Sequence, residues 1–201
     1  MRRLAICSTV LPILLWSVLA AGQTWRVVGE RVPDSTVYDL AGNAVRLSTL
    51  WGEKPVLLVT GSLSCPPSRR TLPATAMLLN DYKGLLSVAI VYVIDAHPSG
   101  DPSPYSGEER VTRKNVKQGI LIRQPRSQEE RISRAVELQE LLGSTAPILV
   151  DNMENTAWQS VGERPNAAVL IDKGGRVLAQ QKWFDDASIR DMIERHIGTE
   201  H

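Results

Sequence analysis

One cysteine stands where it could act as a nucleophile. Cys65 follows a compact apolar run at 55–60 and a turn at 61–64, and Pro66 comes directly after it. Pro66 suits the first position of a helix, because its missing N–H would have no partner there. Free backbone amides at a helix start carry partial positive charge and favour a thiolate. We therefore predict an ionised, reactive Cys65, the alternative being an unreactive packed cysteine.

The residues after Cys65 decide how such a thiol is regenerated. They read Pro-Pro-Ser, so a hydroxyl replaces the second sulfur of a C-x-x-C motif, and the other cysteine, Cys7, lies in the N-terminal segment. A C-x-x-C enzyme closes its cycle with its own disulfide, so this protein would depend on an external thiol or a thioredoxin-like reductant. Arg69 and Arg70 would add positive charge if they face the sulfur.

Two polar residues are candidates for the same site. Ser62 lies three residues before Cys65, the spacing at which peroxiredoxins carry a hydroxyl that touches peroxide, although a serine in a Gly-Ser turn also bonds local backbone. His97 follows a second apolar run at 85–94. Its strand should end at the same rim of the sheet as the helix after Cys65. His97 would then donate a proton or hold the thiolate, the alternative being a loop-capping histidine.

Composition excludes several other kinds of site. Two Cys and three His are too few for a zinc ribbon, an iron–sulfur cluster or a three-His centre, so we expect no metal and no bound cofactor. A formal net charge of +1 gives no overall field to attract nucleic acid. We expect a small-molecule substrate, and a homodimer is possible.

The elements that position these residues follow a recognisable order. A hairpin at 37–50 is followed by buried strands at 55–60 and 85–94 with a helix at 66–81 between them, which predicts a right-handed parallel unit. Next come a helix at 128–142 ended by Gly143, a strand at 147–150, a short helix at 154–161, a hairpin at 166–172 and 176–181, and a helix from Asp185 or Asp186 to Ile197. This order predicts a thioredoxin-like α/β fold, with a central mixed sheet flanked by helices.

Two features lie between these elements. Residues 95–126 form an insertion after the second core strand, rich in proline and glycine, for which we expect no regular structure. Arg164 and Pro165 precede the last hairpin. Pro165 stands where the thioredoxin-like fold has a cis-proline facing the cysteine, although a trans turn is the alternative. Arg164 would face Cys65 and an anionic substrate.

The N-terminus indicates export. Two arginines precede an apolar run at 4–19 and small residues at 20–22, which predicts a signal peptide at 1–22 and one thioredoxin-like domain at 23–201. The alternative is an uncleaved membrane anchor at 4–21. In both cases the domain would be periplasmic, extracellular or membrane-anchored outside the cytoplasm.

Five short motifs, in order, resemble the iodothyronine deiodinase family. They are residues 61–67 (Gly-Ser-Leu-Ser-Cys-Pro-Pro), 95–98 (Asp-Ala-His-Pro), 103–105 (Ser-Pro-Tyr), 126–131 (Arg-Ser-Gln-Glu-Glu-Arg) and 151–155 (Asp-Asn-Met-Glu-Asn). The resemblance covers about two-thirds of the chain, roughly from 45 to 172.

The resemblance implies a thioredoxin-like enzyme in which a selenocysteine or cysteine attacks iodine on an aromatic ring. Cys65 falls at that position, His97 at the family's histidine for substrate binding and proton transfer, and Asp95 at its acidic neighbour. Ser64, Pro66 and Arg126 belong to the same motifs as supporting residues, although Arg126 has surface ion pairing as its alternative role. The insertion would help to shape the substrate cleft, and the family's usual N-terminal anchor keeps that alternative open.

Two departures from the family pattern bear on the reaction rate and on how Cys65 is regenerated. Sulfur stands where vertebrate members use selenium, so a slower enzyme is expected. Leu63 occupies a position where several relatives carry a further cysteine. Three functions therefore remain: reductive deiodination by Cys65, a one-cysteine thiol peroxidase or thiol-disulfide reductase, and a binding protein without turnover.

Overall fold

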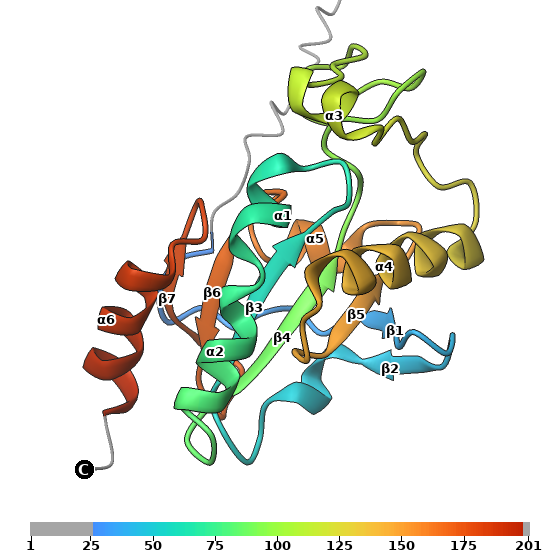
Figure 1. Cartoon of the computed structure of the whole chain (residues 1–201). Coiled ribbons are helices and arrows are strands. Elements are labelled where there is room, and N and C mark those ends of the chain that lie inside the picture. The colour runs from blue at the N-terminus through green and yellow to red at the C-terminus, as the bar shows by residue number, and fades with distance from the viewer. Residues whose placement is uncertain (1–25, 199–201) are drawn as a thin grey trace, which may run out of the picture.

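The computed structural model describes residues 26–198, which are built around one seven-stranded mixed sheet (Figure 1). The strand order is β2-β1-β5-β4-β3-β6-β7. The central strands β3 (Val56–Gly61), β4 (Ser87–Tyr92) and β5 (Ile148–Asp151) run parallel. The flanking strands pair antiparallel: β1 (Thr36–Tyr38), β2 (Ala44–Arg46), β6 (Ala168–Ile171) and β7 (Val177–Gln181). This confirms the predicted mixed α/β sheet.

Helices cover both faces of the sheet because the central strands are apolar on both sides. Leu57 and Val59 of β3 face a core completed by α2 (Ala74–Asp81), α4 (Gln128–Leu142) and α6 (Asp186–Ile197). Val56 and Leu58 face the other core, against the 3-10 helix η1 (Leu47–Leu50) and α5 (Thr156–Ser160). Figure 1 shows α1, α2 and α4 in front of the sheet.

The predicted helix at 66–81 is present in two parts. The first, α1, spans Pro66–Thr71, and α2 begins after Pro73, at the irregularity expected for a proline. Gly61, the last residue of β3, lies under this helix pair. A Cβ at Gly61 would come within 2.5 Å of Leu72 Cδ1, so the glycine lets the end of α1 pack closely on the strand.

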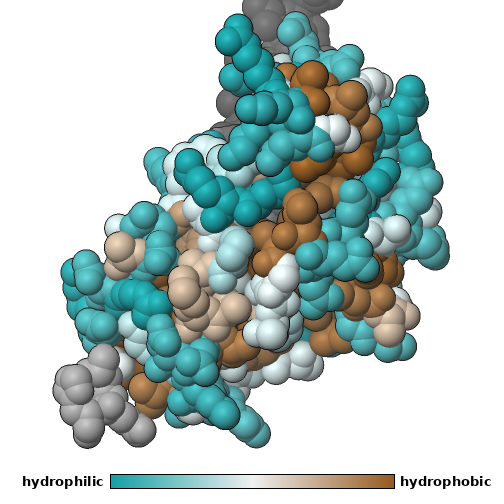
Figure 2. All heavy atoms as spheres, in the orientation of Figure 1, coloured by the Kyte–Doolittle hydropathy of each residue, from teal (hydrophilic) through white to brown (hydrophobic). Residues whose placement is uncertain are grey.

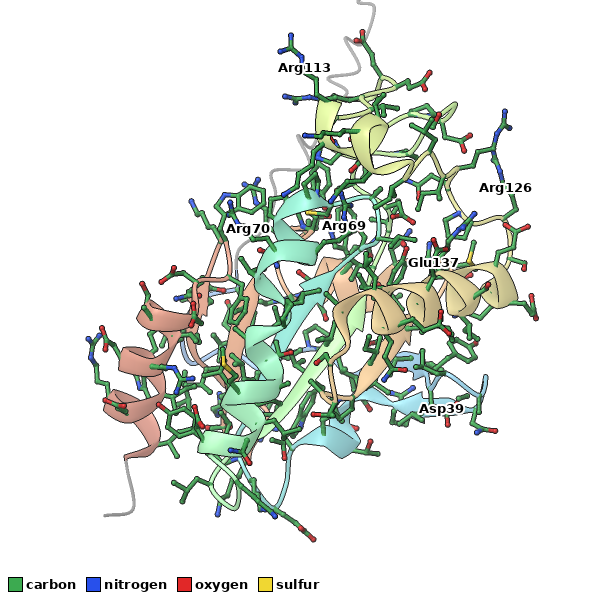
Figure 3. The ribbon with its side chains drawn as sticks, in the orientation of Figure 1. Asp39, Arg69, Arg70, Arg113, Arg126 and Glu137 are labelled. Carbon is green, nitrogen blue, oxygen red and sulfur yellow. The ribbon has the colours of Figure 1, made fainter. Side chains whose placement is uncertain are left out.

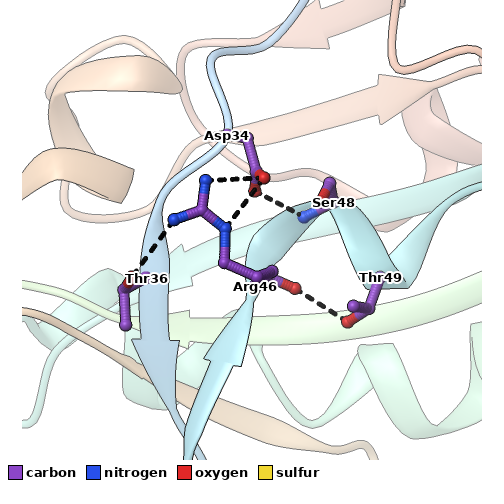
Figure 4. Close-up of polar contacts among 5 residues, drawn as sticks. All are labelled: Asp34, Thr36, Arg46, Ser48 and Thr49. Carbon is purple, nitrogen blue, oxygen red and sulfur yellow. Dashed lines mark hydrogen bonds and ion pairs between the residues drawn. The ribbon is translucent and has the colours of Figure 1, made fainter.

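The N-terminal hairpin is fastened to η1 by one carboxylate (Figure 4). Asp34 accepts hydrogen bonds from Nε and Nη2 of Arg46, at 2.9 and 2.7 Å, and from the backbone amide of Ser48 at 2.9 Å. The Arg46 and Asp34 side chains are 57% and 34% exposed, so the ion pair is a surface pair of small energetic value.

The insertion contains a helix that the sequence analysis did not expect. This helix, α3, spans Arg113–Gln118 between β4 and α4. The Thr112 hydroxyl caps its first turn by accepting from the Asn115 amide, and Gly119 ends it with φ +71°. Proline and glycine elsewhere in the insertion hid this short capped segment. Figure 1 places α3 beyond the end of α1, above the carboxyl ends of β3 and β4.

The ends of the chain bear on the localisation hypothesis. None of the helices within residues 26–198 is long and apolar enough to cross a membrane. The signal peptide predicted at 1–22, with its alternative anchor at 4–21, lies outside the described residues.

Candidate active site

Cys65 lies at the N-cap of α1, directly after the turn that follows β3. Pro66 takes the first helical position, as predicted. The Cys65 amide donates to the Ser62 carbonyl at 3.2 Å, which closes the turn. The residue is only 1% exposed. The cysteine therefore has the expected place in the chain but is closed off from solvent.

Burial decides the charge state of this thiol. It raises the pKa of Cys65, while contacts with Ser68 and the positive charge of Arg69 act in the opposite direction and the Asp95 carboxylate adds to the rise. The net direction is upward, so the ionised thiolate predicted from the helix start is wrong for this conformation. Desolvation of the sulfur outweighs the hydrogen bonds with Ser68 and the charge of Arg69.

Asp95 holds the cysteine turn from the end of β4. Its Oδ1 accepts from the Ser64 amide at 3.0 Å and its Oδ2 from the Tyr92 hydroxyl at 2.9 Å. The Tyr92 oxygen in turn accepts from the Leu63 amide at 3.3 Å. Burial raises the pKa of Asp95, which is fully enclosed, although Ser64 and Tyr92 oppose the rise. Asp95 thus orients the two residues that precede Cys65.

His97 reaches the same turn through its backbone. Its amide donates to the Ser64 hydroxyl at 3.0 Å, while its ring Nδ1 lies 3.1 Å from the Arg110 carbonyl. A carbonyl oxygen can only accept, so Nδ1 carries the proton and Nε2 of the neutral ring is left as an acceptor. Burial lowers the pKa of His97 below its usual 6.5, assisted by the charges of Arg110 and Arg69. At neutral pH this histidine is a proton acceptor.

Ser62 is a buried backbone partner. It is fully enclosed, and its hydroxyl accepts from the Ala96 amide at 3.4 Å. Its carbonyl is the acceptor for the Cys65 amide. This geometry agrees with the local backbone role that was the alternative to contact with peroxide.

The segment before β6 closes the other side of the site. The peptide bond before Pro165 is trans, so the expected cis-proline is wrong and the alternative turn is present. The Pro165 carbonyl accepts from the Ser68 hydroxyl at 2.8 Å, and the Arg164 carbonyl accepts from the Thr60 hydroxyl at 2.7 Å. These two bonds fix the segment to α1 and β3, with the prolyl peptide in the ordinary isomer.

Arg164 and Tyr105 are two further half-buried residues, and Tyr105 interacts with the sulfur. The Nε atom of Arg164 is enclosed and has no hydrogen-bond partner. The charges of Cys65 and Arg164 both act on the pKa of Tyr105, which burial raises above its usual value. Tyr105 also accepts a hydrogen bond from Trp158 Nε1 at 3.1 Å, with the two rings edge to face. Tyr105 is thus within electrostatic range of both Cys65 and Arg164.

Arg126 does not belong to this group. Its side chain is 65% exposed and pairs with Asp101 at 2.5 Å, while its amide donates to Glu130 at 2.7 Å. Figure 3 shows Arg126 at the outer end of the insertion, well apart from Arg69. Its alternative role, surface ion pairing beside the start of α4, is the one that its contacts support.

A groove opens beside the cysteine turn, between α1, the insertion and α4. Its volume is about 720 Å³, and its lining includes Leu63, Arg69, Ile120 and Leu141. Leu141 is 56% exposed. Figure 2 shows hydrophobic atoms gathered over the region where the insertion approaches α4, bordered by hydrophilic ones. The groove therefore combines apolar walls with charged residues.

The model of the iodothyronine deiodinase family matches residues 5–195. The chain belongs to the iodothyronine deiodinase family. It is 25% identical to type I iodothyronine deiodinase from Xenopus laevis over 148 residues, which cover 73% of this chain and 54% of that protein. It is 30% identical to thyroxine 5-deiodinase from Bos taurus over 152 residues, 72% and 45% of the two chains. The chain thus spans about half the length of these relatives.

Solved structures identify the fold of this deiodinase family member. It resembles the thioredoxin domain of a thiol-disulfide oxidoreductase from Bacteroides vulgatus, with a TM-score of 0.57 and 18% identity over 86% of this chain and 99% of that one. A second match is peroxidoxin BcpB from Mycobacterium tuberculosis, with a TM-score of 0.56 and 17% identity over 87% and 98%. The predicted thioredoxin-like fold is confirmed, and the family agrees with the predicted oxidoreductase class.

Sequence reasoning missed one residue of this deiodinase-family site and left another undecided. Asn115 of α3, which is fully buried, bonds both the cysteine turn and Arg69. The turn residues Thr112 and Gly119 were the signal that could have revealed its helix. For Arg69 and Arg70 the structure decides: Arg69 faces the site, while Arg70 is exposed, and Figure 3 shows them on opposite sides of α1.

Proposed function

We propose that this chain is a thiol-dependent oxidoreductase that removes iodine reductively from an iodinated aromatic small molecule, with Cys65 as the nucleophile. The observation that carries the proposal is the family match together with the place of Cys65, at the rim where β3 gives way to α1. The parallel register of β3 and β4 ends at the pair Gly61 and Tyr92, so the turns that follow these strands meet at one edge.

The reaction begins with attack of the sulfur on iodine. An S–I bond forms, the C–I bond breaks, and the ring carbon receives the electron pair and then a proton. An external thiolate displaces iodide from the sulfenyl iodide to give a mixed disulfide, and a second thiolate releases Cys65. The substrate is reduced by two electrons, and the two external thiols become a disulfide. This scheme needs no second cysteine in the chain.

The buried thiol requires a proton acceptor before it can attack. Burial raises the pKa of Cys65, so the sulfur is protonated at neutral pH in this conformation. His97 has an unoccupied Nε2 acceptor and a lowered pKa, and its backbone is bonded to the residue before the cysteine. We assign His97 the role of base for the thiol, with the protonated ring then returning the proton to the aromatic carbon.

The groove beside the cysteine turn suits the substrate class. Its apolar walls, Ile120 and Leu141, can accept an aromatic ring, and Leu63 connects it to the turn that carries Cys65. Arg69 lines the groove, and its charge can attract an anionic oxygen such as a phenolate. We place the ring in the groove and its oxygen toward Arg69.

Iodide release tests the proposal. Purified protein incubated with dithiothreitol and either 3-iodotyrosine or an iodothyronine should release iodide, and Cys65→Ser should release none above the protein-free rate. His97→Gln should lower turnover about 10²-fold, the size of one proton-transfer contribution. Equal release by the wild type and Cys65→Ser would overturn the proposal. A parallel sample with hydrogen peroxide and mass spectrometry of Cys65 measures the peroxidase alternative.

One observation favours a second candidate, a binding protein that uses the cleft without turnover. A sulfur that is 1% exposed and has a raised pKa is a poor nucleophile. This candidate predicts that an iodophenol binds equally well to the wild type and Cys65→Ala, with no iodide released by either. Weaker binding by Cys65→Ala together with turnover by the wild type would exclude it.

A further inference from the structure

Asn115 is a fully buried amide that joins the insertion to the cysteine turn. It lies in α3 and has no exposed surface. Its Nδ2 donates to the Ser64 carbonyl at 2.8 Å, and its Oδ1 accepts from Arg69 Nη2, also at 2.8 Å. One side chain therefore contacts both the residue before Cys65 and the cation of α1.

Arg69 is held mainly by these same groups. Its Nη1 donates to the Leu63 carbonyl, and its Nη2 is shared between Asn115 and the Gln118 side chain at 2.8 Å. Its Nε is enclosed without a partner. Within residues 26–198 no carboxylate forms an ion pair with Arg69, although the charge of Asp95 acts on it from further away. Neutral carbonyls and amides fix where the charge of Arg69 lies.

The charged groups around the sulfur come from several elements. Arg69 of α1 favours the ionised sulfur and Asp95 after β4 opposes it. Tyr105 of the insertion faces the sulfur, and Arg164 and Glu163 of the segment before β6 face Tyr105. Among these groups, Arg69 is the cation whose field acts on Cys65, and its neighbour Arg70 is exposed.

We propose that Asn115 is a positioning residue for Cys65, which keeps the guanidinium of Arg69 beside the sulfur and the Ser64 carbonyl away from it. The insertion then has a chemical role besides lining a cleft, because its helix holds the charge that activates the thiol. The proposal rests on the nucleophilic role of Cys65 proposed above. It assigns no contact between Asn115 and the substrate.

The pH dependence of Cys65 alkylation tests this proposal without any substrate. Iodoacetamide reacts with the thiolate, so the rate at each pH reports the ionised fraction. Asn115→Asp, which places a carboxylate against Arg69 where the amide oxygen was, should shift the inflection to higher pH and slow alkylation at pH 7 about three-fold or more. Asn115→Ala should shift it in the same direction by a smaller amount. Lys114→Gln, which removes an exposed charge from the same helix, should leave the profile unchanged.

A second pair of variants keeps the test decisive if the Asn115 variants do not fold. Arg69→Gln and Arg70→Gln remove the same charge from adjacent positions of α1, and only the first should shift the inflection upward. Thermal unfolding and circular dichroism identify the folded variants. Unchanged inflections in folded Asn115 variants, or equal inflections in the two arginine variants, would overturn the proposal. Failure of deiodination alone leaves the inflections interpretable, since alkylation needs no substrate, and a change in how often the sulfur is exposed rescales the rate at every pH without moving the inflection.

Discussion

Two buried aspartates end neighbouring strands and have different surroundings. Asp151, at the end of β5, accepts from the amides of Asn152, Ala157 and Trp158 at 2.8 to 2.9 Å. The charge of Arg131, which is 2% exposed, favours the ionised form of Asp151 and also that of Asp95. Asp95, after β4, accepts from one amide and one hydroxyl. Both carboxylates are fully enclosed, and burial raises the pKa of each.

The difference indicates that Asp151 is a structural anchor for the start of α5, whereas Asp95 belongs to the cysteine site. Asp151 has donors at both of its oxygens and fixes the start of α5, so the cost of its burial is better compensated than that of Asp95. Asp95 has fewer donors and faces the only thiol of the described residues, whose pKa its charge raises. A buried charge with incomplete compensation beside a potential nucleophile is typical of functional sites.

The largest loss of stability is expected on replacing Asp151, the buried carboxylate with the most hydrogen-bond donors. Asp151→Ala leaves three amides without their acceptor and removes the negative charge that acts on the buried Arg131, so it should lower the free energy of unfolding by about 3–5 kcal/mol. Urea denaturation measures this. Asp151→Asn keeps one acceptor and should lose less. A loss below about 1 kcal/mol for Asp151→Ala would contradict the anchor role.

The pH dependence of stability sharpens the description of Asp95. Because burial raises its pKa above the ordinary 3.8, the folded protein holds this proton more tightly than the unfolded chain does. The stabilisation of the folded protein by this proton is complete below about pH 3.8, and it is lost as the pH rises through the folded pKa of Asp95. The stability of the wild type relative to Asp95→Asn should therefore fall as the pH rises above about 3.8. Urea denaturation across this rise in pH would refute this if the two curves ran parallel.

Replacing Asp95 should also have a smaller effect, on the pKa of the Cys65 thiol. The Asp95 charge raises the pKa of Cys65, so Asp95→Asn should lower it and speed alkylation at pH 7 about two- to five-fold. This direction is opposite to that expected for Asn115→Asp. The alkylation profile measures it, with Asp186→Asn on the distant α6 as the control. A slower reaction of Asp95→Asn would show that Asp95 supports the sulfur by orientation instead of opposing it by charge.

The smallest loss of stability is expected on breaking the ion pair of an exposed carboxylate, Asp34. Asp34 pairs with Arg46 at the surface of the N-terminal hairpin (Figure 4). Arg46→Ala should lower the free energy of unfolding by less than about 1 kcal/mol, because water screens the pair. Urea denaturation beside Asp151→Ala makes the contrast direct. A loss as large as that of Asp151→Ala would remove the distinction between buried and exposed carboxylates.

The sequence was sufficient to predict those helices and strands that are marked by nearby capping residues or by a continuous apolar run. The helix at 128–142 has its predicted bounds because Ser127 and Gly143 cap it, and the apolar runs gave the central strands within one or two residues. The short helix α3 was missed because proline and glycine dominate the surrounding composition. The peptide before Pro165 was assigned by analogy with the fold, and a single residue type does not determine an isomer.

The site was predictable in position but not in electrostatics. The place of Cys65 at a strand-to-helix junction follows from residues 55–66 alone. Its pKa depends on how much protein covers it, and that cover comes from the insertion and the segment before β6, far along the chain. The same reason explains Asn115: nothing within α3 indicates that its amide meets Ser64.

The enclosure of Cys65 has a kinetic consequence. With 1% of the residue accessible, neither an aromatic substrate nor a reductant meets the sulfur in the conformation described. Any catalytic cycle must include a step in which the covering segments withdraw, and the frequency of that opening sets a ceiling on turnover for every reagent. The same closure shields a sulfur–iodine bond from water until the next opening.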